Sequence, residues 1–397
     1  MKWESIFLVI ILLIMAGCGN NKQSGDLIIV DVTANYPKKE LILQDLFDIE
    51  YIPLETNDEF ITSANIQAIG KNVIILRNLR SDGDIFIFDR NGKGLKKINR
   101  LGQGAEEYTN VLDVTLDENN DEIFINNHYS NKIFTYDLSG NFKRSFKQKD
   151  DFFYDQIGNF DQDYLICHDG YYDGYYEPIK KDVKRNFFLI VSKQDGSIKE
   201  IQIPYKEKKK LILYEIGADE FAIKDRAIRN RQLIPNIDSW ILVEPSADTI
   251  YCYSQDHKMT PIIMRTPSIQ SMNPEIFLFV GVITNRYYFM QTVKKTYDFI
   301  SDNGFPHTDI VYDKQEDTIS ECIIYNGDFT TKKPMSLTYE IPMFTFANKG
   351  FAFMKRLEAH ELVEAYEKGE LKGELKEIAA TLDEESNPVI MLAKHKK

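Results

Sequence analysis

The chain has 397 residues, with 48 lysines and arginines against 61 aspartates and glutamates, and its formal net charge is −13 at pH 7. This acidity argues against nucleic acids and anionic membrane surfaces as binding partners. The chain is also too long for a single ordinary hydrophobic core, and 12% of its residues are aromatic. Both features favour a fold that stacks repeated β-sheets.

The N-terminal segment is predicted to be a signal peptide and not part of the fold. A run of ten apolar residues ends at Ala16, which is too short for a membrane-spanning helix of about 20 residues. The segment Met15 to Cys18, with methionine in place of the usual leucine, resembles the lipobox of bacterial lipoproteins. The resemblance implies that residues 1–17 are removed, that Cys18 is acylated, and that residues 18–26 form a polar tether. We expect a protein of the cell envelope, at the outer membrane, held by its acyl chains alone; a plain secretory signal is the alternative.

The rest of the chain repeats one unit, a few strands with a tight polar turn before the last of them. Three copies are clear and two are fainter: Ile85–Ile98, Ile133–Phe146, Phe188–Ile201, Thr249–Ile263 and Asp309–Ile324. Their turns recur every 48 to 60 residues, whereas a four-stranded propeller blade needs about 40 to 50. The pattern predicts an all-β fold over residues 27–397, a six-bladed antiparallel β-propeller with its extra residues in loops.

The expected blades follow in chain order. The first five span Ala64–Arg100, Val111–Phe146, Tyr154–Pro204, Leu211–Arg265 and Ile276–Ile324, and the sixth begins near Ser336. A helical insertion at about 357–382 interrupts the sixth blade, because Leu371, Leu375 and Ile378 recur at helical spacing. This blade lacks one strand, and we expect the N-terminal strand Leu27–Thr33 to supply it by pairing with Val389–His395, which closes the ring.

The connection between the first two blades carries a more specific motif. Residues 87–108, IFDRNGKGLKKINRLGQGAEEY, resemble the hallmark of NHL-like six-bladed propeller lipoproteins of Gram-negative bacteria, a turn glycine, a strand, Gly-x-Gly and Glu-Tyr. Gly102, Gly104, Glu107 and Tyr108 match, whereas Ala105 stands where that family commonly has proline. The resemblance implies the propeller fold, but that family is largely uncharacterised, so it implies little about activity.

Long connections are expected to gather on one face of the propeller, where binding sites are common. They are Gly170–Arg185 in blade three, Lys224–Ser239 in blade four, Lys294–Thr308 in blade five, and the helical insertion. Tyrosine and arginine, which dominate binding surfaces, cluster in the first two. The candidate ligand-binding residues are Tyr171, Tyr172, Tyr175, Tyr176, Arg185, Arg226, Arg229, Arg231 and, from the motif above, Tyr108. The alternative is that the tyrosines pack the loops and the arginines pair with local acids.

A catalytic site is the competing interpretation. His128, His168 and His307 fall in connections of different blades and could hold a divalent metal over the central channel, as in propeller hydrolases or lyases. No short histidine spacing supports this, and no cofactor is otherwise predicted. The remaining cysteines, Cys167, Cys252 and Cys322, lie in strand-like runs and are expected to be buried free thiols, with one disulfide left open.

The sequence therefore predicts a monomeric, lipid-anchored, exported propeller that is not an enzyme and binds a glycan, a peptide or a partner protein through its loop-rich face. A metal-dependent propeller enzyme and a structural subunit of an envelope complex are the alternatives.

Overall fold

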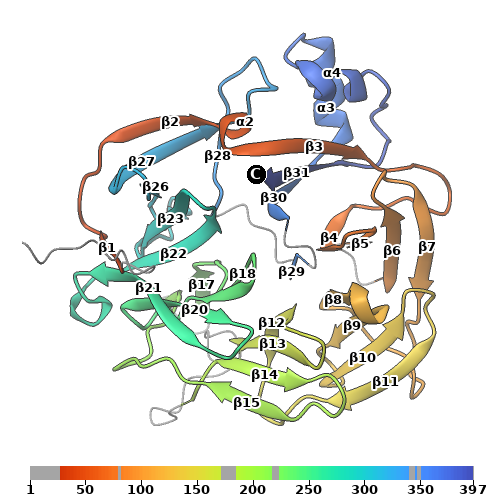
Figure 1. Ribbon diagram of the computed structural model, residues 1–397, viewed down its shortest axis with the longest axis horizontal. Helices are drawn as coiled ribbons and strands as arrows, with labels where there is room; N and C mark the ends of the chain where they lie inside the picture. Colours follow the sequence, from red (N-terminus) through yellow and green to blue (C-terminus); the bar gives the residue numbers. More distant parts are fainter. Residues whose placement is uncertain are drawn as a thin grey trace, which may run out of the picture.

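The computed structural model describes residues 27–78, 82–170, 185–216, 223–338, 345–346 and 350–396. They form a ring of mainly antiparallel sheets, as Figure 1 shows. Blade one consists of β4 (Asn65–Ile69), β5 (Val73–Arg77), β6 (Asp84–Asp89) and β7 (Gly94–Asn99). Blade two consists of β8 (Asp113–Asp117), β9 (Glu122–Asn127), β10 (Lys132–Asp137) and β11 (Phe142–Lys147). Blade three consists of β12 (Tyr154–Asn159), β13 (Tyr164–Asp169), β14 (Phe188–Ser192) and β15 (Ile198–Ile201).

The remaining three blades complete the ring, so the predicted six-bladed propeller is confirmed. Blade four consists of β18 (Leu233–Asn236), β19 (Ser239–Leu242), β20 (Thr249–Ser254) and β21 (Met259–Thr266). Blade five consists of β22 (Ile276–Ile283), β23 (Tyr287–Lys294), β26 (His307–Asp313) and β27 (Thr318–Tyr325), with β28 (Pro334–Met335) against β27. The described strands of blade six are β30 (Phe351–Leu357), β31 (Val389–His395) and β3 (Phe47–Pro53).

The helical insertion is also confirmed, since α3 (Ala359–Glu367) and α4 (Gly373–Ala379) lie between β30 and β31. The buried side chains of Leu362 and Leu375 join the same apolar cluster as Tyr51 of β3. The insertion therefore packs against the sixth blade and does not form a separate unit. The two-residue strand β29 (Thr345–Phe346) pairs in parallel with β4 of blade one.

The N-terminal segment covers the outer edges of three consecutive blades. Strand β1 (Ile28–Asp31) pairs in parallel with β21 of blade four, and β2 (Lys38–Ile42) pairs in parallel with β27 of blade five. After the short helix α2 (Leu43–Leu46), β3 pairs with the C-terminal strand β31, with Phe47 opposite His395 and Pro53 opposite Val389. The ring is closed by an N-terminal strand, but the predicted pairing of Leu27–Thr33 with Val389–His395 was wrong. β1 instead covers the outer edge of blade four by pairing with β21. The chain reaches β31 only with the later strand β3, which begins at Phe47.

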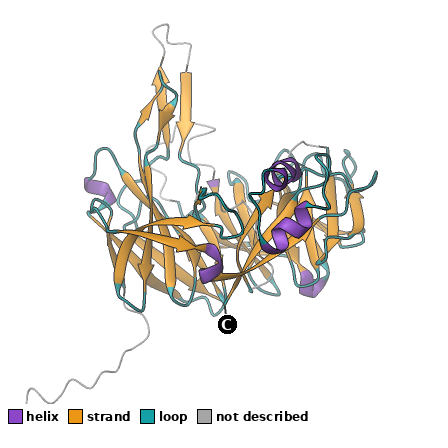
Figure 2. Ribbon diagram, turned by 90° about the horizontal axis from the view of Figure 1, so that it is seen from above, coloured by secondary structure: helices purple, strands orange, loops and turns teal. Residues whose placement is uncertain are grey.

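The fourth blade begins later than predicted. Strands β16 (Ile212–Ile216) and β17 (Ile223–Ala227) lie inside the predicted fourth blade, yet they pair only with each other among the described strands. They form a hairpin inserted between blades three and four, and Figure 2 shows this hairpin standing out from the ring. The segment Lys224–Ser239 is therefore the entry into blade four and its first strand, not a connection between the second and third strands. Because strands of a blade alternate in direction, the entry still lies on the predicted loop-rich face.

The tight turn between the third and fourth strands repeats with one backbone conformation. In the first three blades, left-handed φ values of +83°, +85° and +73° belong to Gly92, Gly140 and Gly196. His257 and Asp317 take up positive φ at the equivalent turns of blades four and five. At Gly92 a side chain is also excluded sterically, because a Cβ there would overlap the carbonyl oxygen of Pro53 in β3. The turn of blade one thus packs directly on the strand that closes the ring.

Neighbouring blades are joined by apolar packing and by buried side-chain hydrogen bonds. One apolar cluster joins blades one and two, and another joins blades two and three. The amide oxygen of Gln67 accepts the N–H of Val114 in the next blade at 3.1 Å. The amide oxygen of Gln156 likewise accepts the N–H of Leu233 at 3.0 Å. These bonds satisfy groups shielded from water and fix the inner strands of adjacent blades relative to each other.

Candidate functional site

The described structure has a cleft of about 700 Å³ on the loop-rich face, between the entry to blade four and the long connection of blade five. One wall is the end of β17 with residues 228–230, and the other is the hairpin of β24 (Tyr297–Asp298) and β25 (Asn303–Gly304). Gln291 and Val293, at the end of β23, lie between these walls. We call this cavity the Arg226 cleft. Its volume is within the range of small-molecule sites.

Arg226 joins the two walls of the cleft. Its Nη2 donates to Oδ1 of Asp302 at 2.5 Å, and its Nε donates to the hydroxyl of Tyr297 at 3.1 Å. The hydrogen bond from Arg226, and next that from Tyr297, lowers the pKa of Asp302 below its usual value. The side chains remain 43% exposed at Arg226 and 65% exposed at Asp302. The pair is therefore accessible to solvent, and an incoming anion could compete with Asp302 for the guanidinium.

Two amide groups lie in the lining of the cleft with unused hydrogen-bonding capacity. Gln291 is fully buried, and its Nε2 donates to Asp309 at 2.8 Å. Among the described residues nothing donates to its Oε1, and nothing accepts from the buried Nδ2 of Asn230. Buried polar groups are normally satisfied, so the unused acceptor of Gln291 and the unused donor of Asn230 beside one cavity call for an explanation, and a ligand in the cleft would supply one.

Two further predicted residues line this cleft. Arg229 is exposed in the segment after β17, and His307 is exposed at the first position of β26. The structure therefore brings His307 beside Arg226 and Arg229, which precede it by about 80 residues in the sequence. Sequence reasoning did not single out Tyr297 and Asp302, although both lie in the predicted long connection Lys294–Thr308. It had no signal for Gln291, which is a polar residue inside a strand.

The other predicted arginines have different surroundings. Arg185 forms a 2.6 Å ion pair with Asp169, donates to the carbonyl of Asp151, and stacks on the Phe152 ring at 3.7 Å. Arg185 therefore joins the two ends of the blade three connection through Asp169. It does not line the Arg226 cleft. The predicted Tyr171, Tyr172, Tyr175 and Tyr176 lie outside the described residues.

Tyr108, which was predicted as a ligand-binding residue, is a core residue and does not line the Arg226 cleft. Its ring is fully buried, its hydroxyl donates to the carbonyl of Gly83 at 2.7 Å, and the same oxygen accepts the N–H of Arg100 at 2.9 Å. Burial raises the pKa of Tyr108 to about 12. Within the same motif, Glu107 accepts the N–H of Gly104 at 2.9 Å. The motif therefore shapes the connection from blade one to blade two.

Charged side chains also meet at the inner strands of blades two to four. Arg231 is buried, and burial lowers its pKa to about 10, while Asp113 and Asp155 favour its charged form. Burial raises the pKa of Asp113 to about 6 in spite of Arg231. Arg231 thus belongs to an inter-blade charge cluster and not to the Arg226 cleft.

The three candidate metal ligands lie in separate environments. His168 is buried, with Nδ1 2.7 Å from Oδ1 of Asp155. His128 stacks edge-on against Phe153 at 4.5 Å, and His307 belongs to the Arg226 cleft. No group of three or more histidine, cysteine, aspartate or glutamate residues in the described ranges could hold a metal ion.

The three cysteines within the described residues are free thiols. Cys167 and Cys322 are buried, and Cys252 is partly buried. Burial raises the pKa of Cys167, and it raises the pKa of Cys322 to about 12. The expectation of free thiols is confirmed, and Cys252 is less buried than predicted. No helix in the described part of the chain is long and apolar enough to cross a membrane.

Fold and cleft together define a six-bladed β-propeller with a ligand-sized cavity on its elaborated face. The chain belongs to the family described as Domain of unknown function (DUF4934), which matches residues 27–394. This match does not identify the NHL-like lipoprotein family that the sequence resembles. The propeller fold that the resemblance implied is correct. No curated protein matches the sequence significantly.

Solved structures are similar to this chain at low sequence identity. A protein of Bacteroides fragilis, provisionally named an exported protein, is 15% identical with a TM-score of 0.57, covering 91% of this chain and 100% of its own. A DUF4221 family member from Bacteroides vulgatus is 13% identical with a TM-score of 0.43, covering 88% and 96%. Virginiamycin B lyase from Staphylococcus aureus is 13% identical with a TM-score of 0.33, covering 71% and 94%. At 15% identity the similarity to the Bacteroides fragilis protein concerns the fold alone.

Proposed function

We propose that this protein is a lipid-anchored, exported binding protein whose Arg226 cleft holds an acidic glycan, and that it acts without catalysis. The observation that carries the proposal is the pair of unused amide groups on Gln291 and Asn230 beside two exposed arginines in one 700 Å³ cavity. The amides suit sugar hydroxyls, which both donate and accept, and the arginines suit a carboxylate. The aromatic ring of Tyr297 supplies an apolar surface in the same wall.

The proposed location depends on the N-terminal segment and on one fold relative. Residues 1–17 have the features of a lipoprotein signal peptide, with Cys18 as the acylated residue. The protein of Bacteroides fragilis with the same fold is provisionally named as exported. An exported propeller on a lipid anchor would present its ligand cleft to the cell envelope or to the outside.

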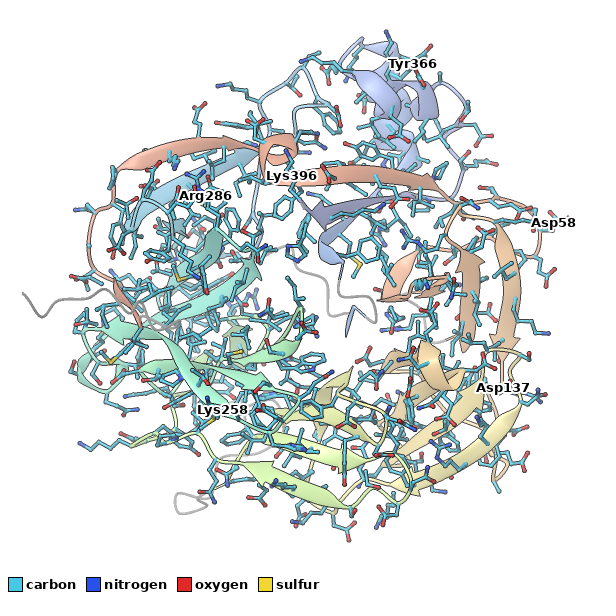
Figure 3. All side chains as sticks on the ribbon, in the orientation of Figure 1. Asp58, Asp137, Lys258, Arg286, Tyr366 and Lys396 are labelled. Atoms are coloured by element: carbon cyan, nitrogen blue, oxygen red, sulfur yellow. The ribbon has the colours of Figure 1, made fainter. Side chains whose placement is uncertain are left out.

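The test is binding of acidic and neutral oligosaccharides to the purified protein, first on a glycan array and then by titration calorimetry. Arg226→Ala and Arg229→Ala should each weaken the binding of an acidic oligosaccharide by about 2 kcal/mol, roughly thirtyfold, with little change in melting temperature. Lys258→Ala is the matched control, because Lys258 is an exposed cation in the turn between β20 and β21, away from the cleft. Figure 3 labels this residue.

Asp302→Asn should act in the other direction. Its carboxylate competes with the ligand for Arg226, so the variant should bind the acidic oligosaccharide more tightly than the wild type. The proposal fails if no acidic glycan binds, or if the two arginine variants bind as well as Lys258→Ala. Binding of an acidic peptide but of no glycan would assign the cleft to a protein partner instead.

A further inference from the structure

A second cavity, of about 500 Å³, lies on the face opposite to the Arg226 cleft. It is formed where three consecutive blades turn from their first to their second strand. The turns are the 3-10 helix η1 (Glu118–Asn120) after β8, residues 160–163 after β12, and residues 237–238 after β18. Figure 1 shows these three strands next to one another at the inner side of the ring. We call this cavity the opposite-face pocket.

The chemistry of the opposite-face pocket differs from that of the Arg226 cleft. Its polar lining consists of amides, carboxylates and a hydroxyl, among them Asn119, Asn236 and Ser239, and none of the described lining residues is lysine or arginine. Phe160 and Trp240 supply apolar surface in the lining, and both side chains are almost fully buried. A pocket of this kind offers hydrogen bonds in both directions but no cation to an anionic ligand.

The polar groups of this pocket are held in fixed positions. Oδ1 of Asp161 accepts the backbone N–H groups of Asp163 and Tyr164, each at 2.8 Å. The buried ammonium group of Lys193 donates to Oδ2 of Asp117 and to the carbonyl of Asp161, both at 2.5 Å. Lys193 therefore balances the charge of Asp117 from behind the lining. Internal hydrogen bonds thus fix the turns that form the pocket.

One polar atom in the lining has no partner. Asn159 is the last residue of β12, and its Oδ1 is buried. Among the described residues nothing donates a hydrogen bond to this oxygen. Such a group is costly to leave unsatisfied. Because Asn159 lines the pocket, a small rotation of its amide would present this oxygen to a hydroxyl group of a bound ligand.

We infer that the opposite-face pocket binds a neutral mono- or disaccharide. Sugar hydroxyls both donate and accept, which matches a lining of amides and carboxylates, and Phe160 and Trp240 provide apolar surface for the carbon faces of a ring. The volume is within the range of small-molecule sites, and the lack of lysine and arginine in the described lining disfavours acidic sugars. This site is independent of the proposed function of the Arg226 cleft.

The test is titration of the purified full-length protein with a panel of neutral mono- and disaccharides, by calorimetry and saturation-transfer NMR. We expect at least one neutral sugar to bind, and Asn159→Leu to weaken that binding at least tenfold while the melting temperature is kept or raised. Asn119→Ala, an exposed position on η1, should weaken binding about threefold or more without affecting folding. Asn91→Ala, an exposed turn residue in blade one, is the matched control.

The inference is overturned if no neutral sugar binds to the folded protein, or if Asn159→Leu and Asn119→Ala bind the sugar as well as Asn91→Ala. It is also overturned if Arg229→Ala abolishes neutral-sugar binding, because the sugar would then occupy the Arg226 cleft. Loss of acidic-glycan binding in Arg229→Ala with neutral-sugar binding retained would support two separate sites, and each site can fail without the other.

Discussion

Gly92→Ala tests whether the turn of blade one supports the closing strand β3. At φ +83° an alanine costs on the order of 1 kcal/mol through its left-handed backbone alone. Its methyl group would also overlap the carbonyl oxygen of Pro53, so the turn must move away from β3. That movement weakens the 2.8 Å hydrogen bond from the N–H of Glu55 to the carbonyl of Gly92, which costs about 1 kcal/mol of stability. Overpacking of the added methyl group costs about 1 kcal/mol more. We expect the free energy of unfolding to fall by about 3 kcal/mol.

Gly140→Ala is the matched control, since Gly140 has φ +85° and a Cβ there would lie 3.2 Å from the side chain of Ile98, which can move. We expect this variant to lose only about 1 kcal/mol. With an unfolding entropy of about 2.1 cal/mol/K per residue over roughly 370 residues, the melting temperature should fall by about 4 °C for Gly92→Ala and about 1 °C for Gly140→Ala. Differential scanning calorimetry gives both values. Equal losses in the two variants would refute the reasoning, because the contact with Pro53 would then add nothing.

Three further predictions follow from buried charges and from the N-terminus. The pKa of Asp113 is raised to about 6, so the folded state binds the extra proton and the stability of the wild type falls as pH rises from about 4 to 6. At pH 8, Asp113→Asn should therefore have a free energy of unfolding up to about 3 kcal/mol higher than the wild type, and a higher melting temperature. At pH 4 the two proteins should have almost the same stability. A variant that is less stable than the wild type at both pH values would contradict this. Lys193→Ala leaves the buried Asp117 without its cation and should lose about 3 to 5 kcal/mol in thermal unfolding, whereas the exposed Lys199→Ala should lose almost nothing. Mass spectrometry of the protein from a bacterial host should find an acylated Cys18 at the mature N-terminus and no acylation in Cys18→Ala; an unmodified cysteine in the wild type would exclude the lipid anchor.

The repeated strands and turns could be recognised from sequence because each blade is local in the chain. Alternation in β6 and β10, followed by Gly92 and Gly140, predicted the hairpins and hence the propeller. The strand that completes blade six could not be chosen in this way. β1 and β3 both carry apolar residues, and only the edges available in the folded ring decide that β1 joins blade four and β3 joins β31.

For the candidate site, local sequence identified the elaborated face and the cations Arg226 and Arg229, because long polar connections stand out from the blade period. It did not separate Arg226, which faces a cleft, from Arg231, which is buried among charges of other blades. It also selected Tyr108, whose ring lies between two blades. Exposure of a side chain depends on which blades meet around it, and neighbouring sequence carries little of that information.

The sequence by itself determined the number and order of the repeating units, since strand alternation and left-handed turns are properties of a few adjacent residues. Only the tertiary structure decided which strand closes the ring, which arginines face a cavity, and that Gln291 and Asn159 lie beside cavities on opposite faces. Those outcomes depend on contacts between residues tens to hundreds of positions apart. Such contacts form because blades must bury their faces against each other and satisfy their edges, and this requirement acts on the whole ring at once.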